Sequence, residues 1–280
     1  MTQLAAHRGA LRFLTLPSGK VAVLDAEPAV PRRGTAVLVP GFTGSKEDFA
    51  PLLDPLAAQG YRVLALDLPG QYQSPGPPER DAYTVNWLGS VLNEVVASLG
   101  EEPVHLLGHS FGGLVARAAV VAQPGRYRSL ILLCSGPAGI EGGRKERMER
   151  LEPLAEYGID AVYAALAQEL AADPAAVEVP APLAEFLRDR FLNSSVAGLF
   201  GMGHAIRAEP DLVADLRATA VPALVCFGAN DDAWPPAVQR DMAARLDAPV
   251  VVIDGAAHSP PVEQSALTVA ALSTFWRGTA

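Results

Sequence analysis

The sequence contains few of the residues that build disulfide-linked or metal-held sites. It has two cysteines, Cys134 and Cys226, and it lacks both a Cys-x-x-Cys pair and a His-Glu-x-x-His motif. Each cysteine lies in an apolar run typical of a buried strand, so we expect two reduced thiols without a redox or metal-binding role. No complete Gly-x-Gly-x-x-Gly motif follows an apolar run, so dinucleotide binding is not indicated. We therefore expect neither a metal ion nor another cofactor.

Long hydrophobic stretches and basic clusters are also missing. The sequence has no apolar segment of about 18 residues that could span a bilayer, and residues 1–13 lack the apolar stretch of a secretory signal. These features predict a cytoplasmic protein without a membrane partner. The formal net charge of −9 weighs against a nucleic-acid partner, because phosphates are neutralised by a clustered basic face. We expect a monomer or a homodimer that binds a small molecule.

Short runs rich in valine, isoleucine and leucine predict β-strands. They span residues 11–16, 21–25, 36–39, 63–67, 104–107, 130–134, 223–227 and 250–253. Only Pro17-Ser18-Gly19 and a few neighbours separate the first two runs, which predicts an antiparallel hairpin. From the third onward, the runs are almost continuously apolar and alternate with helical patterns, as in parallel strands covered on both faces. The sequence therefore predicts an α/β fold with a mostly parallel eight-stranded sheet and helices on both faces.

A long interval interrupts this alternation between the sixth and seventh runs. Its helical segments span residues 144–157, 161–171, 183–192, 196–206 and 210–217. A connection of this length without structure would be improbable in a compact domain, so we predict a helical cap, or lid, over the strand ends. Residues 1–136 and 220–280 would form the core, and residues 137–219 the cap and the return to the core. Gly198, Gly201 and Gly203 weaken one cap helix and predict a lid that moves.

The most informative motif is Gly108-His109-Ser110-Phe111-Gly112-Gly113, which follows the apolar run of residues 104–107. A serine between two glycines, at the junction of a strand and a helix, is typical of a nucleophile elbow. Glycine at positions 108 and 112 avoids the collision of a Cβ with the neighbouring strand or the first helical turn. A helical pattern follows directly over residues 114–121. We therefore predict Ser110 as the nucleophile.

A serine nucleophile needs a base, and His258 is the best placed of the five histidines. It follows the last predicted strand, in a loop that can reach the carboxyl edge of the sheet, whereas His109 should point away from the hydroxyl. The base in turn needs a carboxylate that orients it. Asp231 is the preferred acid because it lies just beyond the glycine that ends the seventh strand. Asp232 is the alternative, and Asp254 is less able to address the imidazole from its strand end.

These motifs resemble the α/β-hydrolase superfamily, and the similarity covers essentially the whole predicted core. The order of nucleophile, acid and histidine along the chain is the order in that family. The resemblance implies an oxyanion hole formed by the backbone N–H groups of Phe111, after the nucleophile, and of Phe42, in Pro40-Gly41-Phe42-Thr43-Gly44-Ser45. The chain departs from the family pattern at Pro40, where a histidine is usual, and at Gln71-Tyr72-Gln73, where a His-Gly-Arg type of continuation is common.

The two loops are similar to those of small bacterial carboxylesterases and monoacylglycerol lipases. This resemblance implies a serine hydrolase that cleaves a small carboxylic ester or lactone through an acyl-enzyme intermediate. Ser110 would attack the carbonyl, His258 would transfer the proton, and Asp231 would orient His258. A serine nucleophile is unlike the aspartate of epoxide hydrolases and haloalkane dehalogenases.

Several alternatives stay open at this point. The same triad would serve a thioesterase, a carbon–carbon bond hydrolase or a perhydrolase. A small-molecule-binding module on a hydrolase scaffold is the alternative outside enzymes, and the intact triad weighs against it. Whichever bond is cleaved, we expect the bound molecule to contact residues next to the nucleophile and on the cap helices. These are His109, Phe191, Leu199, Met202 and His204.

Overall fold

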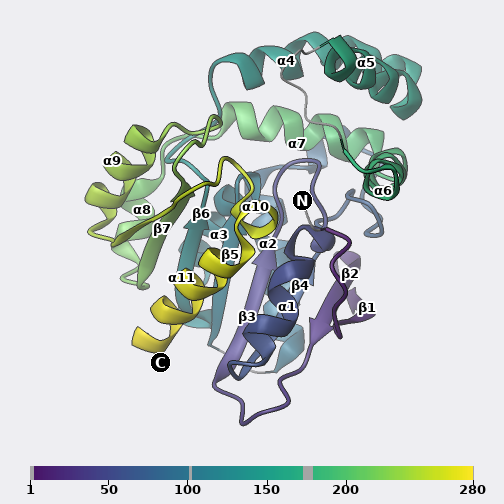
Figure 1. The fold of residues 1–280 in the computed structure, drawn as a ribbon. Helices are drawn as coiled ribbons and strands as arrows, with labels where there is room; N and C mark the ends of the chain where they lie inside the picture. The colour runs from purple at the N-terminus through teal and green to yellow at the C-terminus, as the bar shows by residue number, and fades with distance from the viewer. Residues whose placement is uncertain (1–2, 101–102, 173–178, 280) are drawn as a thin grey trace.

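The computed structural model describes residues 3–100, 103–172 and 179–279, in which eight strands form a mixed sheet (Figure 1). The strands are β1 (Ala10–Leu16), β2 (Gly19–Ala26), β3 (Gly34–Val39), β4 (Tyr61–Leu66), β5 (Val104–His109), β6 (Tyr127–Leu133), β7 (Ala223–Gly228) and β8 (Val250–Ile253). Their order across the sheet is β1-β2-β4-β3-β5-β6-β7-β8. β2 pairs antiparallel with β1 and β4, and the other neighbours are parallel. The predicted α/β fold with a mostly parallel eight-stranded sheet is confirmed.

Helices cover both faces of this sheet. Those outside the long interval are η1 (Lys46–Phe49), α1 (Ala50–Ala57), η2 (Arg80–Ala82), α2 (Val85–Leu99), α3 (Phe111–Ala122), η3 (Pro124–Arg126), α9 (Pro236–Leu246), α10 (Pro260–Glu263) and α11 (Ser265–Gly278). In Figure 1, α1 and α11 lie together in front of the sheet, whereas α2 and α3 pack against each other behind it. Within the described part of the chain, no helix has the length and apolar composition that a membrane span requires.

The last helical part of the chain is divided into two helices, α10 and α11. α10 is a single turn, and Gln264 then leaves the helical region with φ −140° and ψ 58° before α11 begins. The short turn brings the carboxylate of Glu263 to the backbone N–H of Ala257, at 2.6 Å. The interruption therefore fixes the loop that carries His258.

The interval between β6 and β7 is helical, as the sequence predicts. It contains α4 (Gly143–Leu151), η4 (Glu152–Tyr157), α5 (Ile159–Ala172), α6 (Ala181–Leu192), α7 (Val196–Ala208) and α8 (Val213–Ala218). In Figure 1, α4 to α7 lie over one end of the sheet, and α8 returns to its side, where it contacts α3 and α9. We refer to α4–α7 as the inserted helices.

The two ends of this interval are tied to the core by one side chain of α3. Arg117 is 1% exposed, donates to the carbonyl oxygens of Pro137 and Pro210, and pairs with Glu209 at 2.8 Å. The N–H of Gly139 also donates to the carbonyl oxygen of Glu209, at 2.9 Å. A buried guanidinium needs such partners, so entry and exit of the interval are held side by side.

The glycines of α7 allow close packing against the core. A Cβ on Gly201 would lie 2.4 Å from the carbonyl oxygen of Arg80, and a Cβ on Gly198 would lie 3.0 Å from Cα of Gly70. A backbone atom cannot swing aside as a flexible side chain does, so these positions require glycine. The close packing of α7 on the core thus explains why Gly198 and Gly201 are glycines. That the inserted helices move as a lid stays a prediction.

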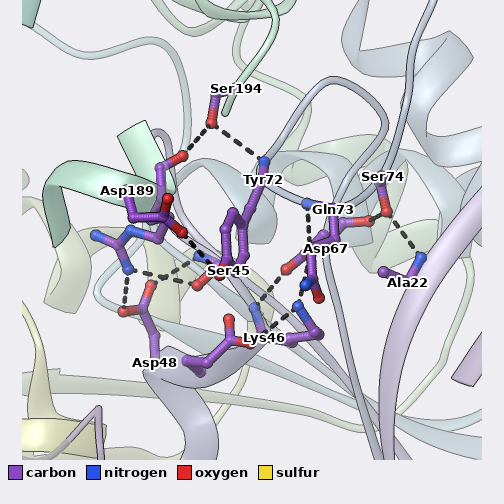
Figure 2. Close-up of polar contacts among 12 residues, drawn as sticks. Ala22, Ser45, Lys46, Asp48, Asp67, Tyr72, Gln73, Ser74, Asp189 and Ser194 are labelled. Atoms are coloured by element: carbon purple, nitrogen blue, oxygen red, sulfur yellow. Dashed lines mark hydrogen bonds and ion pairs between the residues drawn. The ribbon is translucent and has the colours of Figure 1, made fainter. Parts of the chain in front are cut away.

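A buried ion pair connects the start of η1 to the end of β4 (Figure 2). Lys46 Nζ lies 2.9 Å from Asp67 Oδ2, the backbone N of Lys46 lies 2.7 Å from Oδ1, and neither side chain is exposed. Lys46 Nζ also lies 4.8 Å from the ring centroid of Tyr72. Burial raises the pKa of Asp67 to about 6, although the charge of Lys46 opposes this shift. The pair therefore fixes two loops, and each partner depends on the other.

We expect Lys46→Met to lower the free energy of unfolding by about 3–5 kcal/mol near pH 8, because Asp67 is left as a buried, unpaired carboxylate. The loss should be smaller near pH 5. The pKa of Asp67 is raised on folding and should rise further without Lys46, so the carboxyl group is protonated as pH falls and its unpaired charge disappears.

Urea unfolding of wild type and Lys46→Met at both pH values measures this difference. Lys20→Met, at an exposed position of β2, is the matched control and should leave the midpoint nearly unchanged. An equal loss for Lys46→Met at the two pH values would contradict the expectation.

Candidate active site

The turn between β5 and α3 holds Ser110 in a strained backbone conformation. Its φ of 55° and ψ of −123° lie outside the regions that residues with a side chain favour. A Cβ on Gly108 would lie 2.2 Å from the carbonyl oxygen of Gly112, and a Cβ on Gly112 would lie 2.4 Å from that of Pro40. The two glycines therefore let α3 pack directly on the ends of β3 and β5, and this packing maintains the strain at Ser110.

Side chains from three separate loops meet at the carboxyl edge of the sheet. Ser110 follows β5, Asp231 follows β7, and His258 follows β8. His258 Nε2 lies 3.0 Å from Ser110 Oγ, and His258 Nδ1 lies 2.8 Å from Asp231 Oδ1. The structure thus places in one hydrogen-bonded chain the three residues that the sequence predicts as nucleophile, base and acid.

Asp231 is buried and held as an anion. Besides His258, its Oδ1 accepts from the backbone N–H of Ala233 at 3.0 Å, and its Oδ2 accepts from Gln239 Nε2 at 2.7 Å. Burial alone would raise the pKa of Asp231, but the hydrogen bonds from His258, Ala233 and Gln239 hold it below its usual range. The carboxylate is therefore ionised near pH 7, with both oxygens committed.

The two other carboxylates considered from the sequence lie elsewhere. Asp232 is exposed and pairs with Arg144 of α4, with Oδ1 and Nη2 2.7 Å apart. Asp254 is exposed beyond the end of β8. Neither of them hydrogen-bonds His258 in the described part of the chain.

His109 holds the backbone of the neighbouring loop. Its Nε2 lies 2.7 Å from the carbonyl oxygen of His258, so this nitrogen carries the proton, and the two ring centroids are 5.2 Å apart. Burial lowers the pKa of His109 to about 4, and the adjacent His258 adds to the shift. His109 is therefore neutral near pH 7. It also lines the cavity described below.

The two predicted oxyanion donors lie beside Ser110. A Cβ on Gly41 would be 3.0 Å from Ser110 Cβ, which places the Gly41–Phe42 peptide against the nucleophile. Phe111 is the first residue of α3, where backbone N–H groups have no partner within the helix. Neither the N–H of Phe42 nor that of Phe111 donates a hydrogen bond to a described residue. Both are therefore free to bind an oxygen of a ligand.

A cavity of about 1060 Å³ lies between Ser110 and the inserted helices. Its wall includes Ser110, His258 and Phe42 from the core. Most of the remaining wall is apolar and comes from the inserted helices: Met148, Leu151, Val162, Leu166, Leu187, Phe191, Leu199 and Phe200. The cavity is large enough for a small organic molecule, and its wall includes both the hydrogen-bonded chain and a large apolar surface.

Of the five predicted contact residues, three line this cavity and two do not. His109, Phe191 and Leu199 are part of its wall. Met202 is buried in the main core and His204 is exposed, so neither is part of the wall, and their contact with a bound molecule stays a prediction. On α7 the cavity-facing residues form a narrow stripe, and the helical repeat of about 3.6 residues places positions 202 and 204 on either side of it.

Four arginines reach the cavity wall, and each has an acidic partner. The pairs are Arg144–Asp232 at 2.7 Å, Arg147–Glu169 at 2.7 Å, Arg190–Asp48 at 2.8 Å and Arg207–Glu152 at 2.7 Å. Each of the four acids lies on a different element from its arginine, and two of them, Asp48 and Asp232, belong to the core. The pairs therefore also connect the inserted helices to one another and to the core. The charges offset one another, and the apolar side chains dominate the wall.

One group of potential metal ligands occurs at the site. Ligand atoms of His109, Cys134 and His258 lie within 4.8 Å of one another. Both ring nitrogens of His258 are already bonded to Ser110 and Asp231. Burial raises the pKa of Cys134 well above its usual range, which disfavours a thiolate. His258 is therefore engaged in the hydrogen-bonded chain with Ser110 and Asp231. Cys134 and Cys226 are free and buried.

Two residues at the site, Gln239 and Trp234, have no recognisable sequence signal. Gln239 is a helical glutamine that reaches Asp231 only in the fold. Trp234 lies with its ring centroid 6.4 Å from that of His258. Gly136 packs against this ring, because a Cβ at position 136 would overlap the Trp234 side chain.

The chain belongs to the alpha/beta hydrolase family, whose sequence model matches residues 36–272. This span runs from β3 into α11 and includes the elbow, Asp231 and His258. The family resemblance stated from the sequence is therefore confirmed.

The curated relatives are similar to different extents. Pimeloyl-acyl-carrier-protein methyl ester esterase of Aeromonas hydrophila is 30% identical over 216 residues, which cover 74% of this chain and 81% of that protein. A 2-hydroxy-6-oxononadienedioate/2-hydroxy-6-oxononatrienedioate hydrolase of Cupriavidus pinatubonensis is 36% identical over 146 residues, which cover 49% of this chain and 48% of that protein.

Solved structures share the architecture over nearly the whole chain. A hydrolase from Pseudomonas aeruginosa has 26% sequence identity and a TM-score of 0.79, with coverage of 96% of this chain and 99% of that one. The enol-lactonase from Burkholderia xenovorans is 21% identical, with a TM-score of 0.77 and coverage of 94% and 99%. The latter similarity establishes the fold alone.

We expect Gly108→Ala to lower the free energy of unfolding by at least about 1–3 kcal/mol, because the new Cβ meets backbone atoms of Gly112 and Gly113 that cannot yield. Gly125→Ala is the control, since no atom lies within 4 Å of a Cβ at that position. Urea unfolding measures both variants. Similar midpoints for Gly108→Ala and Gly125→Ala would show that the elbow does not need glycine.

Proposed function

We propose that this protein is a serine hydrolase that cleaves a small carboxylic ester or lactone through an acyl-enzyme intermediate. The observation that carries the proposal is the hydrogen-bonded chain from Ser110 through His258 to Asp231. The arrangement matches what nucleophilic catalysis by a hydroxyl requires: a base within reach of the nucleophile and a third group that orients the base. The similarity to a methyl ester esterase over most of both chains supports an ester as the substrate.

The orientation of the imidazole follows from its two partners. Asp231 is an anion and only accepts hydrogen bonds, so Nδ1 of His258 carries the proton that points to it. The lone pair of Nε2 then faces Ser110 Oγ at 3.0 Å. His258 is thus set to take a proton from the hydroxyl, and Asp231 stabilises the imidazolium that forms.

The reaction proceeds in two halves. Ser110 Oγ bonds to the ester carbonyl carbon, its proton moves to His258 Nε2, and the carbonyl oxygen becomes an anion between the N–H groups of Phe42 and Phe111. Collapse breaks the bond to the alcohol oxygen, which takes the proton from His258. Water then attacks the acyl group and gives a proton to His258, and release of the acid returns a proton to Ser110.

The inserted helices supply the acyl pocket in this proposal and act as its cap. Their side chains form most of the apolar wall, and the carboxylates that face the cavity are paired with arginines. An apolar acyl group would gain from burial there, while the reacting carbonyl stays at the edge of the sheet.

We expect a fluorophosphonate to label the wild type and to leave Ser110→Ala unlabelled, because only an activated hydroxyl reacts. Hydrolysis of p-nitrophenyl butyrate should fall by at least about 10⁴-fold in the same variant. Ser90→Ala, at an exposed helical serine of α2, is the control and should match the wild type. Gel fluorescence and initial rates measure the two effects.

Two outcomes would contradict the proposal. Equal labelling of wild type and Ser110→Ala would place the reactive group elsewhere. A wild type that neither labels nor turns over esters, but whose melting temperature rises with a small ligand, would indicate a binding module instead.

We expect Leu166→Trp to shift the chain-length preference, because Leu166 of α5 lines the cavity and a larger ring shortens it. The kcat/KM for p-nitrophenyl octanoate should fall by about 10-fold or more, while that for the acetate changes by less than about 2-fold. Leu267→Trp, at an exposed position of α11, is the control. An equal change for both esters would exclude this part of the cavity as the acyl pocket.

A further inference from the structure

The carbonyl group of Gly41 is held by two hydrogen bonds. Gln71 Nε2 donates to its oxygen at 2.8 Å, and the backbone N–H of Gly44 donates at 3.0 Å. The Gly41–Phe42 peptide is planar, so the direction of this C=O also sets the direction of the Phe42 N–H. Fixing one end of the peptide therefore fixes the proposed oxyanion donor at the other end. Hydrogen bonds to the carbonyl also polarise the peptide and strengthen its N–H as a donor.

Gln71 is itself held in one orientation. The residue is 1% exposed, and its Oε1 accepts from the backbone N–H of Leu68 at 3.0 Å. Reversing the amide would set its NH₂ against that N–H and its oxygen against the carbonyl oxygen of Gly41, two repulsive contacts. The backbone of Gln71 also donates to the carbonyl oxygen of Leu68 and accepts from the N–H of Ser74. The donor that reaches Gly41 is therefore fixed by its surroundings.

The loop that carries Gln71 is braced on the side of the core (Figure 2). Asp67, at its start, accepts from the backbone N–H groups of Lys46 at 2.7 Å and Gln73 at 3.2 Å. Ser74 Oγ, at its end, donates to the carbonyl oxygen of Asp67 at 2.8 Å and accepts from Ala22 of β2 at 2.9 Å. The loop is thus attached both to the sheet and to η1, which directly follows the Phe42 loop.

The inserted helices hold the same loop from the other side. The N–H of Tyr72 donates to Ser194 Oγ at 3.1 Å, and the Tyr72 hydroxyl donates to Asp189 Oδ2 at 3.2 Å (Figure 2). The N–H of Ser195 donates to the carbonyl oxygen of Gly70 at 2.9 Å. Gln71 therefore extends from a loop that is fixed on both sides, and its amide is a rigid support for the Gly41–Phe42 peptide.

We propose that Gln71 is a positioning residue for the oxyanion hole, acting through the hydrogen bond from its side-chain amide to the carbonyl oxygen of Gly41. The proposal rests on the ester hydrolysis proposed above and adds a residue that does not touch the substrate. A preorganised donor contributes chiefly to the transition state, where the carbonyl oxygen becomes an anion. Loss of the support should therefore lower kcat and leave KM nearly unchanged.

The first test compares two substitutions in the same loop. Gln71→Met keeps the length of the side chain and removes the donor, and Gln73→Met is the control, because the Gln73 side chain hydrogen-bonds no described residue. Rates are expressed per active site, titrated to completion with a fluorophosphonate, so that unfolded protein does not count. We expect kcat for p-nitrophenyl butyrate to fall by about 10- to 100-fold in Gln71→Met, with KM within about 2-fold. Gln73→Met should match the wild type.

A transition-state analogue separates positioning from general damage. An alkyl boronic acid forms a tetrahedral adduct with the serine and places an oxygen in the oxyanion hole. Its inhibition constant should rise in Gln71→Met by the same factor by which kcat/KM falls. Unchanged kcat, or a fall in kcat without weaker boronate inhibition, would overturn the proposal.

A second variant retains the acceptor and makes the donor depend on pH. In Gln71→Glu, a protonated carboxyl group can still donate to Gly41, whereas a carboxylate repels its oxygen. Burial and this repulsion favour the protonated form, so the ratio of kcat in Gln71→Glu to kcat in wild type should rise several-fold from about pH 9 to about pH 6. A ratio that does not change with pH would overturn the proposal even if Gln71→Met does not fold. A wild type without Ser110-dependent turnover would overturn the ester hydrolysis itself, and this inference with it.

Discussion

The geometry around Ser110 depends on how closely the first turn of α3 packs on the ends of β3 and β5. Glycine at positions 108 and 112 leaves no side chain between the helix and the strands, where a Cβ would overlap backbone atoms. This one approach sets the position of Ser110 and brings the loop after β3 beside it. It also directs the positive end of the α3 dipole to the place where the proposed reaction develops negative charge.

The core and the inserted helices meet different physical requirements. Proton transfer needs atoms placed to within a fraction of an ångström, and the chain from Ser110 to Asp231 rests on loops that follow strands of one sheet. An apolar pocket needs only the right shape and volume, which α4–α7 supply. The ion pairs Arg190–Asp48 and Arg144–Asp232 join the two parts at the cavity.

The parts that could be predicted from the sequence are those with a local signal. Strands appear as short apolar runs because helices cover both faces of the sheet. The elbow appears as glycines around Ser110 because a Cβ at position 108 would overlap the backbone only four residues away. The face of α7 that lines the cavity could not be predicted in this way. Which of its residues face the cavity depends on its contact with Gly70 and Arg80, far away in the sequence. Met202 therefore packs in the core and not on the cavity wall, a difference that apolar character alone does not show in the sequence.

The support of the proposed catalytic groups was hidden for the same reason. His109 and Gln71 both act on backbone carbonyl groups, those of His258 and Gly41, and a backbone acceptor leaves no trace in the sequence. Pro40 has a fixed φ and stiffens the loop just before Gly41, while Gln71 holds the next carbonyl from the opposite loop. Both departures from the family pattern thus affect the backbone at Gly41. Together, Pro40 and the hydrogen bond from Gln71 hold the backbone just before Phe42, the proposed oxyanion donor.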